Sequence, residues 1–326
     1  MQKVLSGMRP TGKLHLGHLE GVLKSYIEMQ EQYQCFFMVA DWHAMTTTYE
    51  NPEDIHGNTI ELFKDWLSVG IDPEKATLFV QSAVKAHAEL FLLFSFITPV
   101  PWLERNPTYK EQKQELKDKD LSTFGFLGYP VLQAADILIY NAEKVPIGED
   151  QRPHLELTRE IARRFNFLYK TDFFKEPKEI LTKFPKLPGL DNRKMSKSYN
   201  NAIYLTDDAK TVNDKTMTMY TDPLKIKKDD SGHPEGCAVY AFHKVYSGAE
   251  EQEIMARCCK GEMGCVECKK NLIVKINARL EPIRQKRAEI DKNPAVIETL
   301  IKRGNEKALV EASKIMSEVR KIMRLD

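Results

Sequence analysis

Pro10-Thr11-Gly12-Lys13-Leu14-His15-Leu16-Gly17-His18 joins two segments of different periodicity near the start of the chain. The apolar run over residues 4–8 precedes this stretch and has the length and composition of a short strand. From Leu16 to Gln32 the apolar residues recur at helical spacing. The sequence therefore predicts a strand, a turn rich in glycine and proline, and a helix that begins at the histidines.

The start of that helix has the properties of a phosphate-binding site. Free backbone N–H groups and the positive end of the helix dipole favour an anion there. Gly17 has no Cβ and allows a nucleotide to approach the backbone closely. His15 and His18 are one helical turn apart and can face the same phosphate. Taken alone, the two histidines are equally well explained as ordinary surface or core residues.

Strand-like and helical segments alternate through the first part of the chain. Apolar runs at residues 35–40 and 77–81 suit strands buried on both faces, and helical patterns follow residues 51–53 and begin near residue 85. This alternation predicts an α/β fold with a doubly wound parallel sheet. From about residue 205 helical spacing dominates. We therefore expect a Rossmann-like domain over residues 1–204 and an α-helical domain over residues 205–326.

Composition restricts the classes of protein to which the chain can belong. The 326 residues are 42% hydrophobic, enough for a substantial core, and the net charge is +1. No global electrostatic field attracts a polyanion, so nucleic acid would have to bind through local patches. Without a signal-like N-terminus or an apolar run long enough for a membrane span, the sequence favours a cytoplasmic protein.

Two carboxylates stand out in this pattern. Asp136 interrupts the apolar helical segment over residues 129–140, where a charge is costly unless it has a partner or faces a pocket. Pairing with an arginine inside the fold is the structural alternative. Asp150 follows a glycine and precedes a helix with Pro153 in its first turn, so it can simply be an N-cap.

A second motif lies downstream in Arg193-Lys194-Met195-Ser196-Lys197-Ser198. Lysines on a loop that contains glycine and serine suit a clamp on phosphates, because an ammonium group acts as a point charge in several orientations. An ordinary basic surface loop is the alternative. Together with His15-Leu16-Gly17-His18, the hexapeptide resembles the paired HIGH and KMSKS signatures of class I aminoacyl-tRNA synthetases.

Further segments make the resemblance more specific. The chain is similar nearly end to end to bacterial tryptophanyl-tRNA synthetases, through residues 6–12, Ala40-Asp41-Trp42-His43-Ala44, Ala134-Ala135-Asp136-Ile137-Leu138 and Gly148-Glu149-Asp150-Gln151. The resemblance implies that tryptophan is activated by ATP to the adenylate and then transferred to tRNA(Trp). It also implies Mg²⁺ as the companion of ATP, and a homodimer.

The resemblance assigns roles residue by residue. His15, His18, Lys194 and Lys197 would be catalytic, because they stabilise charge on the phosphates. Asp136 would accept the indole N–H, and an unpaired buried carboxylate there would penalise phenylalanine. Tyr129, Gln133 and Gln151 would hold the ammonium group. ATP would contact Arg9, Thr11, Gly17, His18, Gly148, Asp150, Lys194, Met195, Lys197 and Ser198. Arg9 departs from the family, in which many members have glutamine.

A cluster of cysteines occupies the C-terminal part. Cys237, Cys258, Cys265 and Cys268 offer four thiolates within one segment, and Cys259 is an alternative to Cys258. In a cytosolic chain such a cluster favours metal over disulfides, and its spacing suits either Zn²⁺ or an iron–sulfur cluster. Resemblance to those bacterial enzymes with a C-x6-C-x2-C ending implies a [4Fe–4S] cluster.

Three other interpretations remain open from the sequence. Tyrosyl-tRNA synthetase is the nearest, because it belongs to the same class. An adenylyltransferase that needs no tRNA also uses HxGH at a helix start, although the lysine loop and the helical C-terminal region oppose it. An iron–sulfur sensor on a synthetase scaffold would have no physical need for the intact histidines and lysines.

Overall fold

The core of the computed structural model is a five-stranded, fully parallel sheet with strand order β3-β2-β1-β4-β5. The structure describes residues 1–326 except 51, 53, 108, 110–120, 182–186 and 197–198. The predicted α/β fold with a doubly wound parallel sheet is confirmed. The strands are β1 (Lys3–Met8), β2 (Gln34–Val39), β3 (Ala76–Val80), β4 (Lys144–Ile147) and β5 (Lys178–Leu181).

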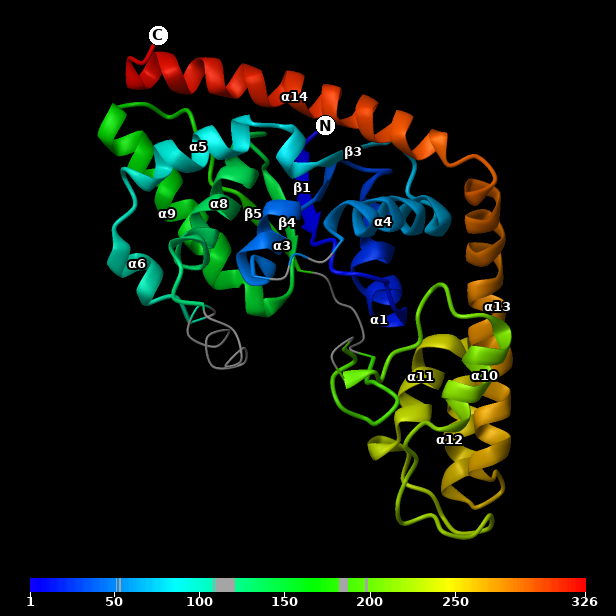
Figure 1. The fold of residues 1–326 in the computed structure, drawn as a ribbon. Helices are drawn as coiled ribbons and strands as arrows, with labels where there is room; N and C mark the ends of the chain where they lie inside the picture. Colours follow the sequence, from blue (N-terminus) through cyan, green and yellow to red (C-terminus); the bar gives the residue numbers. More distant parts are fainter. Residues whose placement is uncertain (51, 53, 108, 110–120, 182–186, 197–198) are drawn as a thin grey trace.

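Helices cover both faces of this sheet (Figure 1). Because successive side chains of a strand point to opposite faces, the central strand β2 contributes to two cores. Phe37 and Val39 pack with Tyr26 and Trp66 on one side, whereas Phe36 packs with the helices of the other side. The helices described up to residue 169 include α1 (Leu16–His18), η1 (Leu19–Leu23), α2 (Lys24–Met29), α3 (Asp41–Thr48), α4 (Ile55–Val69), α5 (Ala86–Ser95), α6 (Val100–Glu104), α8 (Phe124–Leu138) and α9 (Arg152–Tyr169).

The first helix is not the uninterrupted α-helix that the periodicity of residues 16–32 suggests. Residues 19–23 form a π-helical turn, and Gly21 within it has φ −92° and ψ −108°. Single π-turns inside helices are often found at functional sites. The apolar spacing survives the change, and Leu19, Leu23 and Tyr26 are all fully buried.

The C-terminal region is helical, as expected. Below the α/β part lie α10 (Ala209–Met217), α11 (Ala238–Tyr246) and α12 (Glu251–Cys259), packed beside the long α13 (Cys265–Asp291). Helix α14 (Ala295–Met323) then returns across the α/β part, where Figure 1 shows it lying along β3 and α5. The division into two domains at residue 204 stays a prediction. Helix α14 lies after residue 204 in the sequence but packs on the α/β part.

Helix α14 covers the edge of the sheet. Asn305 accepts a hydrogen bond from the backbone N–H of Val80 at 2.9 Å. A Cβ on Gly304 would lie 1.7 Å from the carbonyl oxygen of Leu78, so only glycine allows the helix this close to β3. Covering an exposed strand edge prevents it from pairing with another chain.

Salt bridges fasten the helical part to the α/β part. Arg287 of α13 pairs with the buried Asp65 and with Glu61, both on α4. Arg279 also reaches back to Glu20 at 3.1 Å. Among the described residues, the structure contains no helix with the length and apolarity needed to cross a membrane.

Candidate active site

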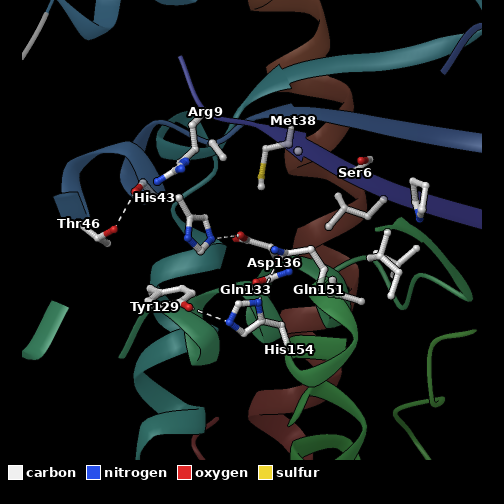
Figure 2. Close-up of a pocket in the computed structure, with 17 residues that line it drawn as sticks. Ser6, Arg9, Met38, His43, Thr46, Tyr129, Gln133, Asp136, Gln151 and His154 are labelled. Atoms are coloured by element: carbon white, nitrogen blue, oxygen red, sulfur yellow. Dashed lines mark hydrogen bonds and ion pairs between the residues drawn. The ribbon is translucent and has the colours of Figure 1, made fainter. Parts of the chain in front are cut away.

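A pocket of about 310 Å³ opens at the carboxyl ends of the strands. It lies between β1 and β4, where the strand order reverses, which is the position at which open α/β sheets bind ligands. Its size is at the small end of ligand sites, which span roughly 300–1,000 Å³. Polar side chains in its lining include Ser6, Arg9, His43, Thr46, Tyr129, Gln133, Asp136, Gln151 and His154 (Figure 2).

Asp136 faces this pocket from α8 and is 1% exposed. Its charged partners are histidines, so the alternative of an arginine partner is wrong for the residues that the structure describes. His87 Nδ1 lies 2.7 Å from Oδ1, His43 Nε2 lies 2.8 Å from Oδ2, and Gln81 Nε2 donates to both oxygens at 2.8 and 2.9 Å. A carboxylate satisfied by three neighbours can remain ionised inside an apolar helix.

The charge on Asp136 is favoured in spite of its burial. Burial by itself raises the pKa of the carboxyl, but hydrogen bonds from His43 and His87 outweigh it, and the pKa lies below its usual range. An ionised carboxylate only accepts, so His87 Nδ1 carries a proton. Its Nε2 lies 2.8 Å from the hydroxyl of Tyr140, which donates to it when the imidazole is neutral. The chain from Tyr140 to Asp136 is thereby fully paired.

A second polar chain lines the pocket near Asp136. The hydroxyl of Tyr129 lies 2.7 Å from Nε2 of His154, and Nδ1 of His154 lies 3.0 Å from Oε1 of Gln151. His154 is 1% exposed on the first turns of α9. Gln133, one turn before Asp136, also lines the pocket. The structure therefore brings the predicted residues Tyr129, Gln133 and Gln151 together with Asp136.

Arg9 lies at the end of β1 and borders the same pocket (Figure 2). The Arg9 side chain is exposed, yet desolvation by the surrounding protein lowers the pKa of its guanidinium. Within the described part of the chain, no carboxylate forms an ion pair with Arg9, and Asp136 is the one acid that lines the pocket. A cation in this position favours an anionic ligand.

The two predicted signature motifs lie next to each other, and those of their residues that the structure describes do not line this pocket. His15 forms an isolated bridge with Tyr204, and the backbone N–H of Leu16 donates to Ile203 at 3.0 Å. The rings of His15 and His18 lie in contact, with centroids 3.7 Å apart and planes tilted by 38°. A Cβ on Gly17 would meet His15 at 3.0 Å and the sulfur of Met195 at 3.5 Å, so the helix start and the lysine loop are adjacent.

The remaining predicted nucleotide contacts are spread around the motifs. The side chain of Lys194 is exposed. Thr11 donates its backbone N–H to Arg9 at 2.9 Å in the turn after β1, and Gly148 caps the short helix η3 (Glu149–Gln151) after β4. Lys197 and Ser198 lie outside the described residues, and so does the side chain of Asp150.

The predicted cysteine ligands line one small cavity between α11, α12 and α13. Cys237, Cys258, Cys265 and Cys268 all border it, whereas Cys259 is exposed and does not. Burial, followed by the neighbouring thiols, raises the pKa of Cys268 to about 12. Within the described ranges, no group of three or more His, Cys, Asp or Glu side chains has the arrangement of a metal site.

Four residues of the site were not assigned roles from the sequence: His43, Gln81, His87 and His154. Gln81 directly follows β3, and His43 lies in the first turn of α3 just after β2, so their position after buried strands was an available signal. His87 is fully buried on α5 and His154 lies on α9, and neither has a local sequence pattern that distinguishes it from a core histidine.

The fold and site together define the class of protein. A doubly wound sheet, a pocket at its switch point, and adjacent histidine and lysine motifs form the architecture of a class I aminoacyl-tRNA synthetase. The family model described as "tRNA synthetases class I (W and Y)" matches residues 1–281.

Full-length relatives narrow this to one branch. The chain is 52% identical to a tryptophan--tRNA ligase of Thermotoga maritima, covering 99% of each sequence. It is 45% identical to that of Aquifex aeolicus, over 99% of this chain and 100% of the relative. A crystal structure of tryptophanyl-tRNA synthetase from Campylobacter jejuni, complexed with ADP and tryptophan, matches with a TM-score of 0.88 at 32% identity, covering 98% of this chain and 99% of that one.

The chain belongs to the tryptophan--tRNA ligase family of class I tRNA synthetases. The family predicted from the sequence is therefore confirmed.

Proposed function

We propose that this chain activates L-tryptophan with ATP to tryptophanyl-AMP and transfers the tryptophanyl group to tRNA(Trp). The observation that carries the proposal is the ionised Asp136, held by three neighbours in the lining of a pocket at the switch point of the sheet. A fixed anionic acceptor in a pocket whose lining also includes apolar side chains such as Met38, Ile137 and Ile147 suits an aromatic ring that carries one N–H donor.

The first step requires alignment and charge stabilisation more than covalent help. The carboxylate of tryptophan attacks the α-phosphorus of ATP, and the bond to pyrophosphate breaks. We assign His15 and His18 to the developing charge on the phosphates, and Lys194 and Lys197 to the departing pyrophosphate, with Mg²⁺ accompanying the nucleotide. Thr11, Gly17, Gly148, Asp150, Met195 and Ser198 complete the ATP site in this proposal. The adjacency of Gly17 and Met195 supports it.

The amino acid is held by three groups of different charge. Asp136 accepts the indole N–H, and Tyr129, Gln133 and Gln151 hold the ammonium group. Arg9 attracts the carboxylate or the α-phosphate, since no described acid pairs with it. Because Asp136 keeps its protein partners, it selects tryptophan through the added charge-assisted hydrogen bond and not through an orphaned charge.

Transfer to tRNA requires a second binding surface. We place it on the helical part of residues 205–326, principally α10 to α13, which lie apart from the sheet in Figure 1. The enzyme would work in the cytoplasm, as a homodimer. Exposed apolar side chains on α8 and after α5, Phe124 at 69% and Phe96 at 70%, are candidates for the subunit interface.

The four cavity cysteines suit a [4Fe–4S] cluster, with Zn²⁺ as the alternative. Their fit rests on the donor set: Cys237, Cys258, Cys265 and Cys268 line one cavity, and burial raises the pKa of three of them. Thiols in this environment ionise only if a cation neutralises them. Cys258 is preferred to Cys259 because Cys259 is exposed outside the cavity. When bound, the metal would cross-link α11, α12 and α13.

Exchange of pyrophosphate into ATP tests the function directly. Tryptophan, tyrosine and phenylalanine are each supplied alone, and we expect exchange with tryptophan only. Exchange with tyrosine would show that Asp136 accepts from a phenol hydroxyl and not from an indole N–H. Activity with none of the three would favour an adenylyltransferase or a sensor. Charging of tRNA(Trp) by the same preparation tests the second step.

A further inference from the structure

We propose that His154 is a positioning residue that fixes the hydrogen-bond polarity of the tryptophan pocket and thereby creates its ammonium subsite. The inference rests on the proposed function, because it concerns how the same pocket orients its substrate. His154 is buried on α9 between two pocket residues, with Tyr129 on one ring nitrogen and Gln151 on the other (Figure 2).

The polarity follows from the atoms that His154 contacts. Its Nδ1 faces Oε1 of Gln151, an amide oxygen that can only accept, so Nδ1 carries the proton. His154 is 1% exposed, and burial disfavours the charged form of a histidine, so we take its imidazole as neutral. A neutral imidazole has one N–H, which leaves Nε2 as an acceptor. The hydroxyl of Tyr129, 2.7 Å from Nε2, must then donate its single proton to the ring. The phenol oxygen of Tyr129 is left with lone pairs only.

Because it can only accept, the phenol oxygen of Tyr129 discriminates between the substrate groups that can bind beside it. Burial raises the pKa of Tyr129, so the phenol stays neutral and its oxygen presents acceptors without a charge. An ammonium group has three donors and no acceptor, whereas a carboxylate has acceptors only. Tyr129 therefore favours the ammonium group and disfavours the carboxylate. Arg9 borders the same pocket, and its cation provides the opposite preference.

Without His154 the same phenol would lose this preference. A free hydroxyl rotates and donates as readily as it accepts, so Tyr129 would accommodate either end of the amino acid. An edge-to-face ring contact, with centroids 5.2 Å apart and planes at 78°, holds the imidazole against Tyr129. The backbone carbonyl of His154 also accepts from Thr158, which belongs to the helix and is unaffected by the side chain.

Direct binding of two substrate fragments tests the proposal. Tryptamine has the ammonium group without the carboxylate, and indole-3-propionate has the carboxylate without the ammonium group. Isothermal titration calorimetry measures both dissociation constants on the full-length protein. For His154→Asn, which can still donate to Gln151 but has no acceptor near the Nε2 position, we expect tryptamine to bind about 10- to 100-fold more weakly, the usual effect of losing a hydrogen bond to a charged group.

His154→Gln supplies the matched control, because its longer amide places an acceptor oxygen near the Nε2 position. This variant should keep tryptamine binding within about threefold of the original. Binding of indole-3-propionate should change by no more than about threefold in either variant. In a Tyr129→Phe background, His154→Asn should have no further effect on tryptamine, because the hydroxyl that it orients is absent.

The two fragments distinguish a positioning role of His154 from a purely structural one. Equal weakening of both fragments in His154→Asn would mean that the histidine only supports the fold, and unchanged binding of both would mean that it orients nothing. Either result overturns the proposal. Pyrophosphate exchange by the unaltered protein decides the proposed function independently, because the fragment measurements do not require activity.

Discussion

Replacing Asp136 by asparagine probes the centre of the site with a change of one charge and almost no volume. The carboxylate accepts from His43, His87 and Gln81. Asparagine keeps one acceptor oxygen and turns an NH₂ group toward another donor. Hydrogen bonds to a charged group contribute about 1.5–3 kcal/mol and neutral ones about 1 kcal/mol, so weakening these bonds should lower the free energy of unfolding by about 2 kcal/mol.

The stability difference should depend on pH. The pKa of Asp136 in the folded protein lies below its usual range, because the hydrogen bonds from His43 and His87 outweigh burial. Its stabilisation is therefore complete above the unfolded-state pKa of about 4, and is lost as the pH falls through the folded value. Urea unfolding should show the full gap between the two proteins at pH 7 and a narrower gap below about pH 4.

Substrate discrimination gives the decisive measurement. The indole N–H would lose a charged acceptor, so kcat/KM for tryptophan in pyrophosphate exchange should fall about 10- to 100-fold. Phenylalanine has no such donor and should be unaffected. The ratio of the two kcat/KM values should fall by the same factor.

Asp65→Asn is the control for a general loss of stability. Asp65 is buried and paired with Arg287, and it does not line the pocket. This variant should be destabilised without any change in the tryptophan-to-phenylalanine ratio. A ratio that stays within about threefold of the original in Asp136→Asn, or that falls equally in both variants, would refute the assignment of Asp136 as the indole acceptor.

Three further substitutions test other parts of the molecule. Arg9→Gln should lower kcat/KM for tryptophan about tenfold, because a charge-assisted contact to the reacting anion is lost. Exchange kinetics measure this decrease, and calorimetry should show that tryptamine binding is unchanged. Weaker tryptamine binding would contradict the role assigned to Arg9. Cys265→Ser should abolish bound metal, measured by elemental analysis, and weaken tRNA charging, yet keep pyrophosphate exchange; loss of exchange would contradict these separate roles. Gly304→Ala should lower the free energy of unfolding, measured with urea, by about 1–3 kcal/mol, because the new Cβ would clash with the carbonyl of Leu78. Gly125 has open space around it, so Gly125→Ala should be neutral or stabilising.

The first three strands were predictable because their signals are local, whereas β4 and β5, each of four residues, were not predicted. Buried runs such as residues 35–40 read as strands at once, and parallel strands bring their carboxyl ends to one edge. Asp136 was detectable as a charge in an apolar helix. Its pairing with Gln81 and His87 was not predictable, because these residues come from the segment between β3 and α5 and meet Asp136 only through the tertiary fold.

Other features depend on backbone geometry that periodicity cannot encode. The π-turn at residues 19–23 shifts the register of the first helix, although the spacing of buried residues reads as regular. The path of α14 is similar: its apolar pattern marks a helix, but the approach of Gly304 to Leu78 determines that it covers the sheet edge. A domain boundary placed at residue 204 from the sequence could not show that α14 contacts β3.

Together, the proposed assignments give a pocket in which groups of different charge fix the orientation of the bound amino acid. Asp136 is an anion, the Tyr129 oxygen is a neutral acceptor and Arg9 is a cation, and all three border one pocket. A reversed substrate would place its carboxylate against lone pairs of Tyr129 while its ammonium group faced a guanidinium. A carboxylate against Tyr129 leaves that buried phenol oxygen without a donor, at about 1–3 kcal/mol. Arg9 is exposed, so solvent screens its repulsion of the ammonium group, which adds less. Both effects disfavour the reversed pose, so the carboxylate that must attack phosphorus points toward Arg9 before ATP is engaged.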